Sequence, residues 1–302
     1  MVIHVESIRK AYGSTVAVEG VSFDVEQAEI FGLIGPNGAG KTTTMECVEG
    51  VRRPDSGSIS VLGLDPVRQA YALQQRIGVQ LQEAQLQKRI KVREAVTLWS
   101  SLYRTRVDGD QLLAQLGLSE KRNAWFMTLS GGQKQRLFIA LALINDPEVV
   151  FLDELTTGLD PQARRAIWEL VRGIRARGKT VFLTTHLMEE AERLCDRVAI
   201  IDHGRLIDAG TPAALVRRHC PERTVIVTTV DGSAAARFRA MPEIEGVEVT
   251  GDDVSIRGRG EDFVTRVIQY LAEHRIAVKD LRTINPTLED VFLRVTGHAL
   301  RN

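Results

Sequence analysis

Short apolar runs recur along the first two thirds of the chain and predict buried strands. They occupy residues 30–34, 77–79, 149–152, 180–185 and 197–201. Helical spacing fills much of the sequence between them, at residues 42–49, 92–127, 137–144 and 162–177. Strands that alternate with helices in this way predict an α/β fold built on a parallel sheet.

The two ends of the chain are patterned differently. Strand-like runs at residues 3–5, 16–18 and 21–25 are separated by turns. Composition changes at residues 219–223, which predicts a linker between a domain at residues 1–218 and a second domain at residues 224–302. In the second domain, expected strands at 224–230, 247–257 and from 277 onward mix with expected helices at 233–241, 263–271 and from 286 onward. This mixture predicts a small α+β domain.

Composition limits the possible partners. The 302 residues allow one large and one small domain, and 39 basic against 39 acidic residues give a net charge of +0. Bulk charge therefore gives no reason to expect a nucleic-acid partner. No apolar run reaches the roughly 18–20 residues that span a bilayer, and residues 1–6 do not resemble a signal peptide. We expect any membrane role to depend on a partner.

The three cysteines, Cys47, Cys195 and Cys220, are odd in number and far apart. This usage predicts reduced thiols of a cytosolic protein rather than a disulfide framework.

A glycine-rich loop follows the apolar run at residues 30–34. Its residues are Gly35, Pro36, Asn37, Gly38, Ala39, Gly40, Lys41, Thr42 and Thr43. They match G-x-x-x-x-G-K-[ST], with a strand before and a helix after, and such a loop aims backbone N–H groups at a polyphosphate. Lys41 is expected to reach the β- and γ-phosphates and the Thr42 hydroxyl to ligate Mg²⁺. The loop predicts a nucleotide-phosphate site.

Two carboxylates end the apolar run at residues 149–152. Asp153 suits the coordination sphere of Mg²⁺, and Glu154 could polarise a water for attack on the γ-phosphate. Paired acids at the end of a buried strand are seldom structural, because burial of an unpaired charge is costly.

A second candidate anion site lies at Leu129-Ser130-Gly131-Gly132-Gln133. Ser130 is well placed to cap a helix, and the two glycines leave backbone N–H groups open.

Three further residues are ambiguous when taken singly. Tyr12 could stack on an adenine ring or simply pack. Gln82, in a polar stretch that also contains Gln80, could touch Mg²⁺ or the attacking water, or could be a solvated loop residue. His186 follows the buried run at residues 180–185, where a structural histidine is common but where ligands of open α/β sheets also bind.

Taken in order, these motifs resemble the nucleotide-binding subunit of ATP-binding-cassette (ABC) transporters over the first 218 or so residues. The stretch from Leu129 to Gln133 discriminates best, because phosphate loops alone occur in many NTPases. The resemblance implies a P-loop NTPase fold with a helical subdomain at about residues 86–145 and an antiparallel β subdomain.

The resemblance also implies roles for individual residues. Lys41, Gln82, Glu154 and His186 would be catalytic, and Thr42, Gln82 and Asp153 would hold Mg²⁺, with Gln80 a weaker match than Gln82. ATP would be bound by the phosphate loop, by Tyr12, by Ser130, Gly131, Gly132 and Gln133, and by Asp160 in the D-loop at residues 157–160. Two departures, Leu155 in place of the usual proline and Gln27-Ala28 in place of a glycine-containing turn, lie off the phosphate contacts.

Members of this family work as head-to-tail dimers, in which each ATP lies between the phosphate loop of one chain and the family signature of the other, which corresponds here to Leu129 to Gln133. The resemblance therefore implies a homodimer, a separate transmembrane permease and a location at the cytoplasmic face of the membrane. Residues 286–297 also resemble the C-terminal extension of daunorubicin-resistance-type subunits, which implies export of a drug, antibiotic or lipid-like molecule. A generic dimerisation or regulatory appendage is the alternative for that segment.

Two other functional classes remain as rivals. A non-transport cassette ATPase of translation or DNA repair usually carries two cassettes, long coiled insertions or zinc modules, and this sequence shows none of them. A small-molecule kinase would leave the stretch around Ser130 unexplained.

Overall fold

A computed structural model describes residues 1–80, 85–229, 238–239, 241, 244–260 and 262–297. Its contacts divide the chain into two compact units, Met1–Pro212 and the described part of residues 213–298. The division lies near residues 219–223, whose role as a linker stays a prediction.

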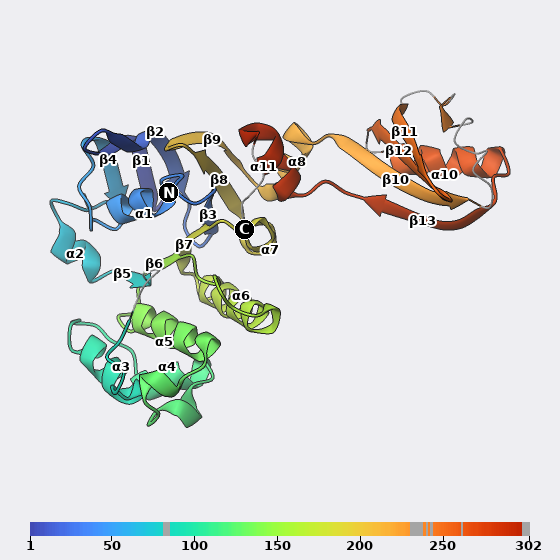
Figure 1. The fold of residues 1–302 in the computed structure, drawn as a ribbon. Helices are drawn as coiled ribbons and strands as arrows, with labels where there is room; N and C mark the ends of the chain where they lie inside the picture. The colour runs from blue at the N-terminus through green and yellow to red at the C-terminus, as the bar shows by residue number, and fades with distance from the viewer. Residues whose placement is uncertain (81–84, 230–237, 240, 242–243, 261, 298–302) are drawn as a thin grey trace. The chain divides into compact units, whose positions relative to one another are not determined.

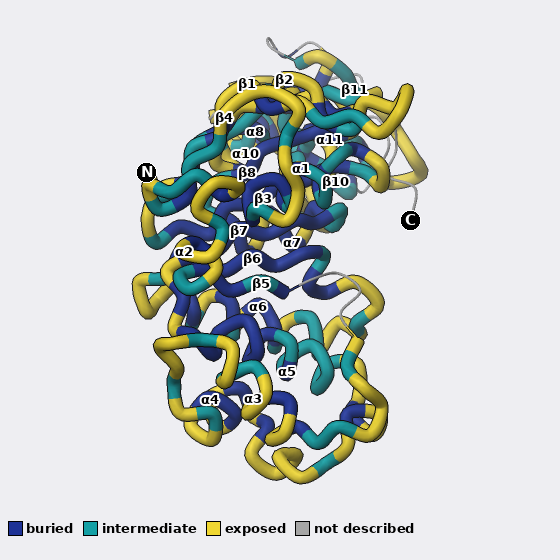
Figure 2. The backbone as a smooth tube through the Cα atoms, turned by 90° about the vertical axis from the view of Figure 1, so that its left-hand side faces the viewer, coloured by how far each residue is buried: buried dark blue, intermediate teal, exposed yellow. Residues whose placement is uncertain are grey.

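The centre of the first unit is a six-stranded sheet in the order β5-β6-β7-β3-β8-β9 (Figure 1). Its strands are β3 (Ile30–Ile34), β5 (Ile77–Gln80), β6 (Val149–Asp153), β7 (Thr180–Thr185), β8 (Arg197–Asp202) and β9 (Arg205–Gly210). All neighbours are parallel except the β8–β9 hairpin at one edge. β3, β6 and β7 are buried along their whole length, as Figure 2 shows, which explains why they read as unbroken apolar runs.

A three-stranded antiparallel sheet, in the order β2-β1-β4, belongs to the same unit. It consists of β1 (Ile3–Tyr12), β2 (Thr15–Val25) and β4 (Ser56–Val61). Residues 16–18 and 21–25, expected as separate strands, form one strand that passes through Gly20 in a left-handed conformation (φ 68°). The α/β fold class with an antiparallel β subdomain is confirmed.

Helices occupy the connections of the first unit. They are α1 (Lys41–Val48), α2 (Ala70–Gln74), α3 (Val92–Ser100), α4 (Gly109–Gln115), α5 (Gly131–Leu143), α6 (Pro161–Ala176) and α7 (Met188–Leu194), and α8 (Pro212–His219) begins where the unit ends. The region expected to be helical at residues 92–127 breaks into α3, α4 and two 3₁₀ turns (Ser119–Lys121 and Phe126–Thr128). Asp108 is the N-cap of α4, since its carboxylate accepts hydrogen bonds from the N–H groups of Asp110 and Gln111, and a new helix therefore begins here.

The second unit is an antiparallel sheet in the order β11-β12-β10-β13, with helix α10 between β12 and β13 in the chain. The elements are β10 (Glu222–Thr229), β11 (Ile244–Thr250), β12 (Asp253–Arg259), α10 (Phe263–Glu273), β13 (Val278–Ile284) and α11 (Leu288–Thr296). The predicted face of Phe263, Val267 and Leu271 is buried in the core of this unit. Most of the helix expected at residues 233–241 lies outside the described residues.

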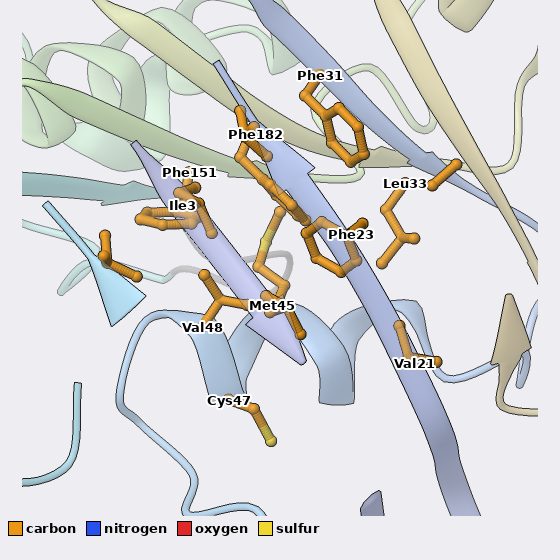
Figure 3. Close-up of a cluster of buried hydrophobic side chains, with 14 of the residues drawn as sticks. Ile3, Val21, Phe23, Phe31, Leu33, Met45, Cys47, Val48, Phe151 and Phe182 are labelled. Atoms are coloured by element: carbon orange, nitrogen blue, oxygen red, sulfur yellow. The ribbon is translucent and has the colours of Figure 1, made fainter. Parts of the chain in front are cut away.

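One aromatic cluster joins both sheets of the first unit to α1 (Figure 3). The ring centroid of Phe182 lies 5.6 Å from that of Phe31 and 5.7 Å from those of Phe23 and Phe151. Met45 of α1 packs into the same cluster. This core fixes α1 against the sheet and so fixes the loop that precedes α1.

We expect Phe182→Ala to lower the free energy of unfolding of the first unit by about 3–5 kcal/mol, because it removes a buried ring and leaves a cavity. All three tryptophans belong to this unit, so tryptophan fluorescence during urea denaturation reports on it. Phe182→Leu, which keeps most of the apolar volume, should cost clearly less. Equal stability of Phe182→Ala and the native chain would contradict this account of the core.

Glu49, at the C-terminal end of α1, is a buried carboxyl with only 3% of its surface exposed. Its Oε1 has no hydrogen-bond partner among the described residues. Burial is the main cause that raises the pKa of Glu49 to about 8, and the nearby Asp153 and Glu46 charges contribute to this rise. The folded chain therefore binds this proton more tightly than the unfolded chain does.

Because the pKa of Glu49 is higher in the folded chain than in the unfolded chain, the free energy of unfolding falls as the pH rises from about 4.5 to about 8. We expect Glu49→Gln to remove this loss. The variant should gain stability relative to the native chain between pH 5 and pH 8.5, by at least about 1 kcal/mol. Urea denaturation across this range measures the difference, and a difference that does not change with pH would contradict the buried-carboxyl interpretation.

Candidate nucleotide-binding site

The register of the parallel strands brings the predicted motifs together. Asp153 at the end of β6 pairs with Thr184 of β7, and Ile34 at the end of β3 pairs with Thr185. The residues that follow these strand ends therefore meet at one edge of the sheet, where ligands of open α/β sheets bind. The phosphate loop, Glu154 and His186 are brought to this edge.

The glycines of the phosphate loop are required by its path between β3 and α1. A Cβ on Gly35 would lie 2.2 Å from the carbonyl oxygen of Ile201. Gly40 is left-handed (φ 99°), and a Cβ there would lie 2.2 Å from the carbonyl oxygen of Ala17. Gly40 is also the N-cap residue of α1, and no side chain at this position accepts a hydrogen bond from the N–H groups of the first turn. These groups can bind a phosphate.

Lys41 is the first residue of α1 and is 5% exposed. Its Nζ donates to the carbonyl oxygens of Gly35 and Pro36, both at 3.0 Å, and lies 3.6 Å from Oε1 of Glu154. Burial lowers the pKa of Lys41, whereas the neighbouring Glu154 and Asp153 charges oppose that shift. The ammonium group is thus held beside the loop in which a phosphate would bind.

Asp153 and Thr42 place two oxygen ligands side by side. The Thr42 hydroxyl donates to Oδ2 of Asp153 at 3.3 Å, and the Thr184 hydroxyl donates to Oδ1. Burial raises the pKa of Asp153, and the bonds from Thr184 and Thr42 counteract this rise. A carboxylate beside a hydroxyl is a donor set that fits Mg²⁺, which usually takes one or two protein ligands together with phosphates and water.

The donor set is small. Within the described ranges, no three or more His, Cys, Asp or Glu side chains form a group that could hold a metal ion. Gln82, predicted as a third ligand, lies outside the described residues. Gln80, the weaker match, is 3% exposed at the end of β5.

Glu154 occupies a strained position at the centre of the site. Its backbone is left-handed (φ 45°), and its N–H donates to the carbonyl oxygen (3.2 Å) and the hydroxyl (3.1 Å) of Thr184. Its carboxylate is 7% exposed, with Oε1 3.3 Å from Nδ1 of His186, a contact whose geometry falls short of a hydrogen bond. Lys41, Glu154 and His186 therefore converge on one point.

Thr184 was missed by sequence reasoning. It bonds both Asp153 and the backbone of Glu154, and so orients the two acids. The available signal was a fully buried hydroxyl in the apolar run at residues 180–185, since buried hydroxyls need partners.

Ser130 and Gln133 form a reciprocal cap at the start of α5. The Gln133 N–H donates to the Ser130 hydroxyl (3.3 Å), and the Ser130 N–H donates to Oε1 of Gln133 (3.0 Å). The expected helix start at residue 137 is therefore wrong: α5 begins at Gly131, because the cap outweighs the low helix propensity of Gly131 and Gly132. Among the residues that the structure describes, no hydrogen bond or ion pair joins residues 130–133 to residues 35–43.

Asp160 and Tyr12 lie at element ends. Asp160 caps α6 by accepting hydrogen bonds from the N–H groups of Gln162 (3.0 Å) and Ala163 (2.9 Å). Tyr12 ends β1 with 41% of its surface exposed, and the Arg52 guanidinium lies 5.3 Å from its ring centroid. The ring is accessible, as adenine stacking requires.

Comparisons with known proteins identify the family to which this chain is similar. Residues 18–157 match the sequence profile of the ABC transporter family. The chain is 40% identical to a Nod factor export ATP-binding protein I from Ralstonia nicotianae, over 100% of this chain and 95% of that protein. It is 38% identical to a daunorubicin resistance ATP-binding protein from Streptomyces coeruleorubidus, over 98% of this chain and 96% of that protein.

Solved structures support the same fold. An ATP-binding subunit of an ABC transporter aligns with a TM-score of 0.66 and 28% identity, over 72% of this chain and 93% of that one. A dimeric bacterial ABC transporter cassette aligns with a TM-score of 0.61 and 25% identity, over 69% of this chain and 98% of that one. The phosphate loop, the paired acids and the full-length relatives lead to one conclusion: this chain belongs to the ABC transporter family, as an ATP-binding subunit with ATPase activity.

Proposed function

We propose that this subunit hydrolyses ATP in a head-to-tail homodimer and thereby drives export through a separate membrane permease. One observation carries the proposal. The chain has two candidate anion sites, at residues 35–43 and at Ser130–Gln133, and no described hydrogen bond or ion pair joins them. A second copy that supplies its own Ser130–Gln133 would complete the site at the phosphate loop. The dimeric cassette among the solved structures supports this arrangement.

The residues of one chain divide the work of hydrolysis. Lys41 and the N–H groups at the start of α1 bind the β- and γ-phosphates, and Tyr12 stacks on the adenine. Thr42 and Asp153, together with Gln82, would hold Mg²⁺, which would supply positive charge to neutralise the phosphates. Glu154 takes a proton from the attacking water, and His186 contacts the γ-phosphate.

The opposing chain completes the nucleotide site. The opposing chain presents the positive end of its α5 to the γ-phosphate. The groups at that end are the Ser130 hydroxyl, the N–H groups of Gly131 and Gly132, and Gln133. We also assign Asp160, the N-cap of α6, to the nucleotide site that the two chains would share.

The export direction and the cargo class rest on relatives of nearly full length. One relative is named for Nod factor export and another for daunorubicin resistance. Their names favour a drug, an antibiotic or a lipid-like molecule as cargo, and they do not favour a role in translation or DNA repair.

No helix in the described part of the chain is long and apolar enough to cross a bilayer. We place the subunit at the cytoplasmic face of the membrane, held there by its permease.

Glu154→Gln tests the proposal. The change keeps the shape of the side chain but removes the base, so ATP affinity should stay within about threefold while kcat falls by at least about 100-fold. ATP-bound dimer should accumulate because it closes without reopening. Nucleotide titration, steady-state hydrolysis and light scattering on a sizing column measure the three quantities.

Glu148→Gln is a matched control, because Glu148 is an exposed carboxylate that directly precedes the same strand and pairs with Arg76. It should behave like the native chain in all three measurements. A Glu154→Gln chain that hydrolyses ATP at the native rate as a monomer would contradict both the assigned base and the dimeric site.

A further inference from the structure

A buried carboxylate, Glu190, links three segments next to the proposed site. It lies in the first turn of α7, four residues beyond His186, and is 1% exposed. Its Oε1 accepts hydrogen bonds from the Thr156 hydroxyl (2.7 Å) and from the indole N–H of Trp168 (2.9 Å). Burial of a carboxylate is costly unless such bonds are made, so these contacts strongly constrain the groups that make them.

Both donors belong to the polypeptide that surrounds the D-loop. Thr156 is fully buried, lies two residues beyond Glu154, and accepts the Leu159 N–H on its carbonyl oxygen (3.2 Å). Trp168 is 4% exposed and lies in α6, the helix that Asp160 caps. Oε1 of Glu190 therefore restrains residues 155–160 on both sides. It binds Thr156 near the start of the segment and Trp168 of α6, the helix that follows the segment.

Two hydrogen bonds stabilise the turn of the chain between His186 and Glu190. The Leu187 N–H donates to the Thr185 hydroxyl at 3.0 Å, and the Glu190 N–H donates to the Leu187 carbonyl oxygen at 3.1 Å. Helices α6 and α7 also pack against each other (Figure 1). The turn that follows His186, the side chain of Glu190 and residues 155–160 are thus linked by short hydrogen bonds.

We propose that Glu190 is a positioning residue for ATP hydrolysis, which keeps residues 155–160 in place relative to Glu154 and His186. The inference rests on the proposed function, in which Glu154 and His186 act at the γ-phosphate. Glu190 itself touches neither ATP nor water in this scheme and acts through Thr156 and Trp168. Small displacements of reacting groups lower rates strongly, so loss of this link affects turnover more than binding.

Glu190→Ala removes the acceptor and should lower kcat by about 10- to 100-fold, with KM and analogue affinity changed by less than about twofold. Glu190→Gln keeps an acceptor oxygen of the same reach and should recover most of the native kcat. Glu189→Ala is the matched control, because its exposed carboxylate pairs with Arg193 on the same helix, and it should retain the native kcat. Rates are expressed per chain that binds nucleotide, so loss of folded protein does not count as loss of turnover.

A second pair of variants tests the same link without altering Glu190. Thr156→Val removes the hydroxyl at nearly constant volume and should lower kcat about tenfold, whereas Thr156→Ser keeps the hydroxyl and should stay within about twofold of the native value. Native kcat per binding-competent chain in Thr156→Val or in Glu190→Ala would overturn the inference while leaving the proposed function intact. A native chain that does not hydrolyse ATP would instead overturn the proposed function and, with it, this inference.

Discussion

The site depends on the contacts that stabilise the buried ammonium group of Lys41. A cation at the N-terminus of α1 meets the positive end of the helix, which is electrostatically unfavourable, and burial adds a desolvation cost. The carbonyl oxygens of Gly35 and Pro36 and the carboxylate of Glu154 offset these costs. The resulting site is arranged for an anion that can take over these contacts, and a nucleotide phosphate is such an anion.

Much of the surrounding fold serves this arrangement. The aromatic cluster around Phe182 fixes α1 against the sheet, and the strand register brings Glu154 to the Lys41 ammonium. The left-handed backbone of Glu154, held by Thr184, turns the carboxylate toward Lys41 and His186. By contrast, the Ser130–Gln133 cap is complete within α5 and makes no described hydrogen bond to the phosphate loop. The proposed division of the site between two chains is consistent with both observations.

The sequence predicted the parallel sheet, the phosphate loop with Lys41 and the paired acids Asp153 and Glu154, because buried strands and phosphate loops have strong local patterns. A role for His186 at the same site was implied only by the family resemblance. Thr184 escaped prediction, since its partners depend on the register between β6 and β7, which no local pattern encodes. The cap at Ser130 was predicted correctly, but the start of α5 was placed too late because the glycines and polar residues that follow Ser130 show no apolar helical spacing. The pairing of Glu190 with Thr156 and Trp168 joins residues 34 and 22 positions apart, and so appears only in the folded chain.

Mixing two inactive variants tests the divided site most directly. Lys41→Ala disables the phosphate loop, and Ser130→Arg, at an exposed position, blocks the signature. Each variant alone should be inactive, whereas an equal mixture should regain about a quarter of the native rate, because half of the dimers then carry one intact site out of two. A mixture no more active than its separate components, or full hydrolysis by Ser130→Arg alone, would contradict the account.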